Sequence, residues 1–204
     1  MPDALSRLAK LFPPPAVPVA APPWERSRAE IGLDFPSDYR GFVDLYGAGR
    51  FSAPDSLACH VHAPTSRPLQ GVREAGFKGY VERHASETGR LFGPEGLDET
   101  DDTKPAYRMF PEPDGLLVWG ENEQGDLFFW LTSDADPDRW PVVMWARGPV
   151  TAYRFDMGMV DVLLGSAQGE IPNVRAMRSP HRRWTMTADW NHDRMNISAG
   201  PASP

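Results

Sequence analysis

The clearest structural signal in the chain is a pair of short apolar runs separated by a turn. Residues 116–119 read Leu-Leu-Val-Trp, and residues 127–131 read Leu-Phe-Phe-Trp-Leu. Continuous apolar runs on either side of a Gly/Asn/Gly/Asp turn are typical of paired strands that are buried on both faces. A similar run over 141–145 follows, so the sequence predicts an antiparallel hairpin and a third strand, each strand carrying one tryptophan. A fourth strand is predicted over 150–155.

Helical periodicity precedes these strands. Residues 3–12 suit a short amphipathic helix, and the proline-rich residues 13–23 form an extended tether behind it. A helix pair follows over 24–31 and 36–46, each helix ended by a glycine, and Asp38 in the first turn of the second helix favours its dipole. The apolar face of that second helix consists of Phe35, Tyr39, Phe42, Val43 and Tyr46.

The remaining elements are predicted from weaker patterns. A strand is expected at 57–61, a helix over 70–90 and an acidic loop over 93–104. After the strands, Asp156 stands where it would cap a last helix. The apolar stripe of this helix is Val160, Leu163, Leu164, Ala167 and Ile171. Beyond Pro172 we expect a basic, aromatic arm with a frayed end.

This order of elements predicts an α+β fold in which helices pack against a mainly antiparallel sheet, because hairpin connections exclude a parallel one there. With 204 residues, 41% of them hydrophobic, the chain is long enough for one sizeable core. We therefore expect one domain over 24–171, an N-terminal extension with a tether over 1–23 and a C-terminal arm over 172–204.

The net charge of −7 is concentrated in one segment. Between Glu95 and Asp138 there are thirteen acidic residues and two basic ones, a local balance of −11, so the rest of the chain sums to +4. Acidic loops keep an aromatic-rich domain soluble, and they also attract a basic partner over long range. Both interpretations stay open on the sequence. For the second, the candidate partner-binding residues are Asp98, Asp101, Asp102, Glu121, Glu123, Asp126, Asp134 and Asp136.

No motif in the sequence predicts catalysis or metal binding. His60 and His62 would point the same way on a strand, but no third ligand follows at a usable spacing. The run Asp134-Ala-Asp136-Pro-Asp138 resembles the start of a calcium hand, yet Arg139 and Trp145 stand where that loop requires glycine and glutamate. Ordinary turn chemistry explains the run better. We therefore predict no catalytic residue, metal ligand or cofactor.

The single cysteine, Cys59, cannot form an intrachain disulfide, which fits a reducing cytoplasm. The N-terminal residues mimic a signal peptide, but their prolines break any apolar helix, and no apolar run reaches the ~20 residues of a membrane helix. The basic arm is short and the domain acidic, which argues against nucleic acid as the partner. We expect a cytoplasmic protein that does not bind membranes.

Several pieces of the chain recur in the order typical of one family. They are the helices over 24–32 and 35–47, then Trp119-Gly120, Gly125-Asp126, Trp130, Trp140-Pro141 and the last helix over 156–164. In these features the chain resembles the SUKH superfamily, in its Smi and Knr type, over about 24–171. Phe35 departs from the pattern, in which leucine is usual before the proline, and the arm after Pro172 is not part of it.

The resemblance implies an α+β binding module without catalysis. Many bacterial members are immunity proteins that hold a cognate polymorphic toxin, often a nuclease, in the cytoplasm, and fungal relatives act as regulatory hubs in cell-wall signalling. The acidic segment adds the expectation that the toxin is basic. Two alternatives remain: a regulatory scaffold of the same fold, and a metal-dependent or hydrolytic enzyme whose ligands would be His60, His62 and His84.

Overall fold

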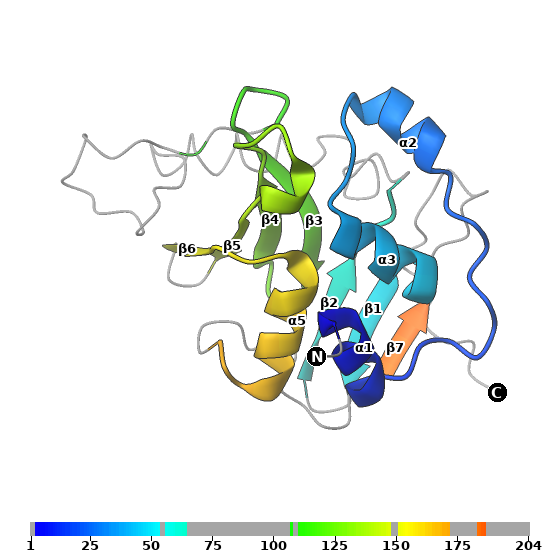
Figure 1. The fold of residues 1–204 in the computed structure, drawn as a ribbon. Coiled ribbons are helices and arrows are strands. Elements are labelled where there is room, and N and C mark those ends of the chain that lie inside the picture. The colour runs from blue at the N-terminus through cyan, green and yellow to red at the C-terminus, as the bar shows by residue number, and fades with distance from the viewer. Residues whose placement is uncertain are drawn as a thin grey trace.

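The computed structural model describes residues 3–53, 56–64, 107, 110–147, 151–171 and 183–186 (Figure 1). Within them, seven strands form one sheet in the order β6-β5-β4-β3-β2-β1-β7, and all neighbouring strands are antiparallel. The strands are β1 (Gly49–Ala53), β2 (Ser56–Val61), β3 (Leu116–Asn122), β4 (Leu127–Leu131), β5 (Val142–Ala146), β6 (Thr151–Phe155) and β7 (Arg183–Met186). The antiparallel sheet that the sequence predicted is confirmed.

The helices pack against this sheet, which confirms the α+β class. They are α1 (Ala4–Leu11), α2 (Trp24–Ile31), α3 (Ser37–Tyr46), the short 3-10 helix η1 (Pro137–Arg139) and α5 (Met159–Gln168). Figure 1 shows α1, α3 and α5 on the same side of the sheet. Leu8, Phe42 and Leu163 from these helices join Trp119 and Trp130 of the sheet in one buried apolar cluster.

The helix pair lies where the sequence placed it. Gly32 and Gly47 end α2 and α3 with φ values of 85° and 73°, a backbone conformation that a residue without a Cβ adopts without strain. Every apolar residue on the predicted face of α3 is buried, since the helical repeat turns that face toward the sheet.

The central strands are buried on both faces, as their continuous apolar runs predicted. Trp119, Phe128 and Trp130 lie on the face covered by the helices. The opposite face has its own buried apolar cluster, which includes Phe129 and Trp145. Alternation along each strand sends neighbouring side chains to opposite faces, so a strand that is apolar throughout needs cover on both.

The N-terminal extension contributes to the core. Leu8 of α1 is fully buried, and Phe12 just after the helix contacts the ring of Phe51 edge-on at 5.3 Å between centroids. The hydroxyl of Tyr46 donates a hydrogen bond to the carbonyl of Phe12. The helix predicted over 3–12 is therefore confirmed, while the division of the chain into extension, domain and arm stays a prediction.

Two strands and one cap differ from the sequence-based expectation. Strands β1 and β7 were not predicted, because neither has the apolar alternation of a typical strand. The expected cap of α5 was wrong: Gly158 precedes the helix, and the Asp156 carboxylate accepts a hydrogen bond from Arg154 instead. The predicted helix over 70–90 and acidic loop over 93–104 lie outside the described residues.

Candidate functional site

The described candidate carboxylates lie at two separate places. Glu121, Glu123 and Asp126 belong to the end of β3 and the turn into β4, whereas Asp134 and Asp136 belong to the connection from β4 to β5. In an antiparallel sheet these two connections lie at opposite ends of β4, a separation of roughly 17 Å for five residues. Asp98, Asp101 and Asp102 lie outside the described residues.

In the β3–β4 turn, Asp126 holds the backbone together. Its carboxylate accepts hydrogen bonds from the backbone N–H of Arg147 at 2.9 Å and from the Asn122 side-chain amide at 2.8 Å. The Asn122 side-chain oxygen in turn accepts from the backbone N–H groups of Gln124 and Asp126. This carboxylate therefore links the turn to the end of β5, which is a structural role.

The two glutamates of this region differ from each other. Glu121 lies within β3 and not in a loop, because the strand continues past its apolar run to Asn122. It is half-buried, and burial raises the pKa of its carboxyl group. Glu123 is exposed, and its carboxylate accepts a hydrogen bond from the backbone N–H of Ala58 at 3.2 Å. Of the two, Glu123 is the one available to a partner.

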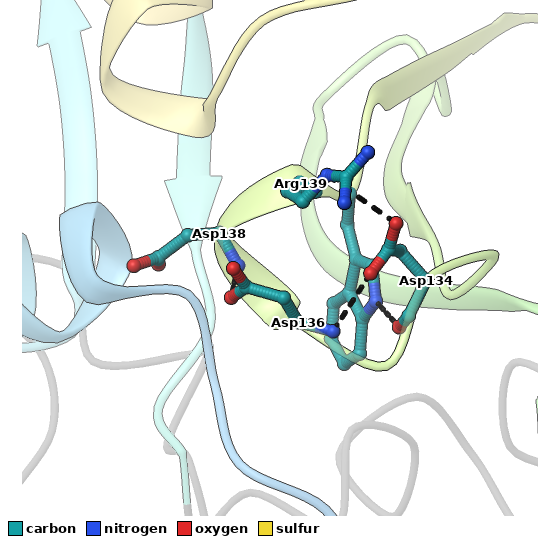
Figure 2. Close-up of polar contacts among 5 residues, drawn as sticks. Asp134, Asp136, Asp138 and Arg139 are labelled. Carbon is teal, nitrogen blue, oxygen red and sulfur yellow. Dashed lines mark hydrogen bonds and ion pairs between the residues drawn. The ribbon is translucent and has the colours of Figure 1, made fainter.

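The β4–β5 connection is a chain of aspartate turns, shown in Figure 2. The Asp134 carboxylate accepts from the backbone N–H of Asp136 at 2.9 Å, and the Asp136 carboxylate accepts from that of Asp138 at 3.1 Å. Asp134 also forms an ion pair with Arg139 at 3.3 Å, and its carbonyl accepts from the Trp140 indole at 2.6 Å. The turn chemistry predicted from the sequence is confirmed.

Asp138 connects this turn to the helix layer. Its carboxylate accepts a hydrogen bond from the backbone N–H of Ser37, the first residue of α3. Figure 2 shows its side chain pointing away from Asp134 and Asp136, toward the blue α3 segment. Because Pro36, which precedes α3, provides no side-chain cap, Asp138 satisfies one of the free N–H groups at the start of the helix.

Asp38 makes the corresponding contact between α3 and α5. One carboxylate oxygen accepts from the backbone N–H of Val160 in the first turn of α5 at 2.9 Å, and the other accepts from Tyr39 N–H at 2.7 Å. A Cβ at Gly158 would lie 2.5 Å from the Asp38 carboxylate, so the absence of a side chain there permits this approach. The residue that caps α5 thus comes from a distant helix.

The fold gathers carboxylates from three segments at this corner: Asp134, Asp136 and Asp138 from the β4–β5 connection, Asp38 from α3 and Asp161 from α5. We call these five residues the acidic corner. Burial raises the pKa of Asp38 above its ordinary value, and the neighbouring Asp161 and Asp138 carboxylates act in the same direction. Hydrogen bonds from Val160 and Tyr39 oppose this shift. Asp161 and Asp138 thus lie close enough to Asp38 to act on its charge, and Asp138 belongs to the same connection as Asp134 and Asp136.

Two of these five residues, Asp134 and Asp136, were predicted from the sequence as candidate partner contacts. The other three were not: Asp138, and also Asp38 and Asp161, whose contribution depends on how α3 and α5 pack. Asp136, Asp138 and Asp161 are exposed. Exposed carboxylates whose backbone is fixed by hydrogen bonds are suited to contact lysine and arginine side chains of a protein partner.

The histidines do not form a metal site within the described residues, where no group of three potential ligands occurs. His60 is half-buried in β2, and burial together with Arg50 lowers its pKa, against a smaller opposing effect of Glu123. His62 follows the strand and is buried, with its carbonyl accepting from the Tyr39 hydroxyl at 2.7 Å. His84 lies outside the described residues.

His62 makes the stability of the protein depend on pH. Burial, with a smaller effect of His60, lowers the pKa of His62 to about 4, against about 6.5 when the chain is unfolded. Between these values only the unfolded chain binds the proton, so stability is fully present above pH 6.5 and is lost as the pH falls toward 4. From pH 7 to 4.5, the free energy of unfolding should fall by about 2 kcal/mol more in wild type than in His62→Gln.

Urea denaturation of both proteins at several pH values measures this difference. At pH 8 the imidazole is neutral in both states, so that measurement gives the packing cost of the substitution alone. Parallel curves for wild type and variant between pH 7 and 4.5 would exclude a buried neutral imidazole.

The comparison with protein families agrees with the fold. A family model described as SMI1-KNR4 cell-wall (SUKH_6) matches residues 24–156, well over half of the chain. The chain belongs to this family and so to the SUKH superfamily. The search of the curated proteins and the search of the solved structures give no match. The matched residues contain α2, α3 and β1 to β6, and they include Asp38, Asp126 and Asp134.

Among the described residues, no helix has the length and apolar character needed to cross a membrane.

Proposed function

We propose that this protein is a non-catalytic immunity protein that binds a basic protein toxin in the cytoplasm and blocks it by occlusion. Family membership supports a protein-binding role, since the superfamily contains many immunity proteins. The acidic corner is the observation that carries the proposal, because it joins carboxylates from three segments on a rigid support. The toxin's activity would be that of a nuclease, whose nucleic-acid-binding surface is basic.

Charge of this kind acts mainly on the rate of association. Long-range attraction between an acidic and a basic surface raises the frequency of productive encounters, and salt screens it. Asp136 and Asp161 would meet the partner first, because both are exposed. Glu123 and the acidic residues Asp98, Asp101 and Asp102 would extend the attraction. The Asp126 carboxylate is bound to the backbone and Glu121 is half-buried. Both would add to the negative electrostatic potential but make little direct contact with the partner.

The test of this function requires a protein toxin encoded beside this gene, and it uses the purified product of that gene. Purified chain should form a stable one-to-one complex with that protein, and inhibition should be complete at one equivalent. The mass of the toxin should stay unchanged after release, because occlusion breaks no bond. Inhibition at a small fraction of an equivalent, accompanied by a change in toxin mass, would identify an enzyme instead. A failure to form any complex would contradict the binding role.

A further inference from the structure

The β1 edge of the sheet carries a short strand from far along the chain. β7 pairs antiparallel with β1, which places Trp184 opposite Phe51 and Met186 opposite Gly49. Of the four residues of β7, only Trp184 is partly buried, and the other three are exposed. Within the described residues β7 is the last strand of the sheet on this side. A single side chain therefore anchors it.

The anchor occupies an aromatic pocket that fits an indole. The Trp184 ring lies 4.6 Å from the ring of Phe51, 5.2 Å from that of Phe42 and 5.5 Å from that of Tyr46, between centroids. Its Nε1 donates a hydrogen bond to the carbonyl of Tyr46 at 2.8 Å. The pocket thus satisfies both the apolar ring and the polar N–H, a combination that favours tryptophan over phenylalanine or leucine.

Two glycines open the edge of β1 to an incoming backbone. A Cβ at Gly49 would overlap the carbonyl oxygen of Thr185, closer than any real contact. At Gly47 a Cβ would lie 2.8 Å from the Met186 sulfur, and φ there is positive as well. The backbone of β7 can therefore approach β1 because Gly49 has no side chain, and Gly47 leaves room for the side chain of Met186. We define the groove as Phe42, Tyr46, Gly47, Gly49 and Phe51.

The groove and the strand that fills it differ in their relation to the family. All five groove residues lie within the matched residues 24–156, whereas β7 lies beyond them. The family match thus covers the groove, and it covers neither β7 nor α5. Because β7 and the groove belong to one chain, an outside segment that enters the groove would compete with an intramolecular contact.

We propose that the groove is a strand-addition site for an extended, tryptophan-bearing segment of a partner protein, and that β7 occupies it in the free protein. The added strand would gain main-chain hydrogen bonds from β1, as β7 does, and its tryptophan would enter the aromatic pocket. Trp184 is the partly buried residue of β7, so we expect an extended backbone with one indole to be sufficient for binding. This site is separate from the acidic corner and does not depend on the proposed function.

A labelled peptide copying residues 181–188 tests the groove on the full-length chain. Trp184→Ala empties the pocket without touching its walls, so the variant should bind the peptide at least tenfold more tightly than wild type, in which β7 competes. A peptide with alanine in place of its tryptophan should not bind. Adding Gly49→Val to Trp184→Ala should abolish binding, since the new side chain meets the strand backbone.

Five results would overturn the proposal. Absence of binding to folded Trp184→Ala, or equal binding by the alanine peptide, would show that the groove does not recognise a separate segment. A Trp184→Ala chain that fails to fold would make β7 an integral strand. A wild-type dimer that Trp184→Ala disrupts would make a second copy the occupant. In wild type, amide hydrogen exchange provides a further measurement: β7 amides should exchange at least a hundredfold faster than those of β4, and equal protection would also overturn the proposal.

Discussion

Replacing Phe42 with alanine should lower the free energy of unfolding by about 3 to 5 kcal/mol. The side chain is fully buried, and its ring stacks on Tyr46 at 4.7 Å and meets Trp184 edge-on at 5.2 Å. Removing it eliminates apolar contact on two sides and leaves a cavity that the surrounding rigid rings cannot fill. A loss of this size is a large fraction of the stability of an ordinary domain.

Chemical denaturation measures the effect, and the same helix provides the control. Leu45 is 38% exposed, so Leu45→Ala, which also places an alanine in α3, should cost less than about 1 kcal/mol. The same large loss is expected for alanine at Tyr39, Trp119 and Trp130, which are also buried in the helix-covered cluster. Midpoints that stay at the wild-type value in all four variants would refute the assignment of this core.

The parts of the fold that could be predicted are those with a strong local pattern. The strands β3, β4 and β5 are continuous apolar runs, and α3 repeats its large apolar residues with helical spacing. Gly32 and Gly47 mark helix ends because their backbone conformation favours glycine. In these elements the local conformational preference and the tertiary packing agree, so the sequence alone is sufficient to predict them.

β1 and β7 were not predicted because their sequences lack a local strand pattern and are explained only by the contact of the two strands with each other. β1 contains Gly49, which disfavours a strand when it is read in isolation. In the fold this glycine makes room for the Thr185 backbone of β7. A glycine in such a position can be assigned to a strand only when the partner strand is known. Trp184 lies in the predicted basic, aromatic arm, but nothing in the sequence relates it to the aromatic pocket.

The cap of α5 was also predicted wrongly because it depends on a contact between distant segments. Asp156 has the right residue type and lies close to α5 in sequence, so a local rule selects it. The cap comes instead from Asp38, which lies more than a hundred residues away and reaches Val160 across the α3–α5 contact. Local rules find caps within one segment, and only tertiary structure shows those that link two helices.

The candidate partner-binding residues were predicted as one continuous acidic segment of the sequence. In the fold, those that the structure describes lie in two separate groups. Successive connections of an antiparallel sheet alternate between its ends, which separates Glu123 from Asp136. Helix packing then adds Asp38 and Asp161 to the second group. Charge counting along the sequence could find the excess of carboxylates, but it could not show which of them share a surface.

Neutralising the acidic corner should slow capture of a basic toxin about tenfold at low salt, a typical effect of electrostatic steering. The variant D136N/D138N/D161N removes three negative charges, and the amide side chains at positions 136 and 138 each keep an oxygen that accepts from the backbone. Fold stability should therefore change little, since exposed charges contribute little to it. Dissociation should change less than association, because steering acts before contact.

Two other triple variants, each with three carboxylates replaced by amides, serve as comparisons. E25Q/D44N/E170Q removes three charges from α2 and from residues near the C-terminal ends of α3 and α5, away from the corner. E121Q/E123Q/D126N neutralises the group at the other end of β4. If total charge alone mattered, all three variants would associate at the same reduced rate. Because we infer that the corner faces the partner, we expect its variant to be the slowest.

The most direct test of the acidic corner is the association rate of wild type and D136N/D138N/D161N with a toxin that forms the complex, measured at about 20 mM and about 500 mM salt. We expect the variant to associate about tenfold more slowly than wild type at low salt. We also expect added salt to slow wild type more than the variant, so that the two rates converge. Equal rates at low salt would contradict it, and would show that these carboxylates only hold the turn and cap the helices.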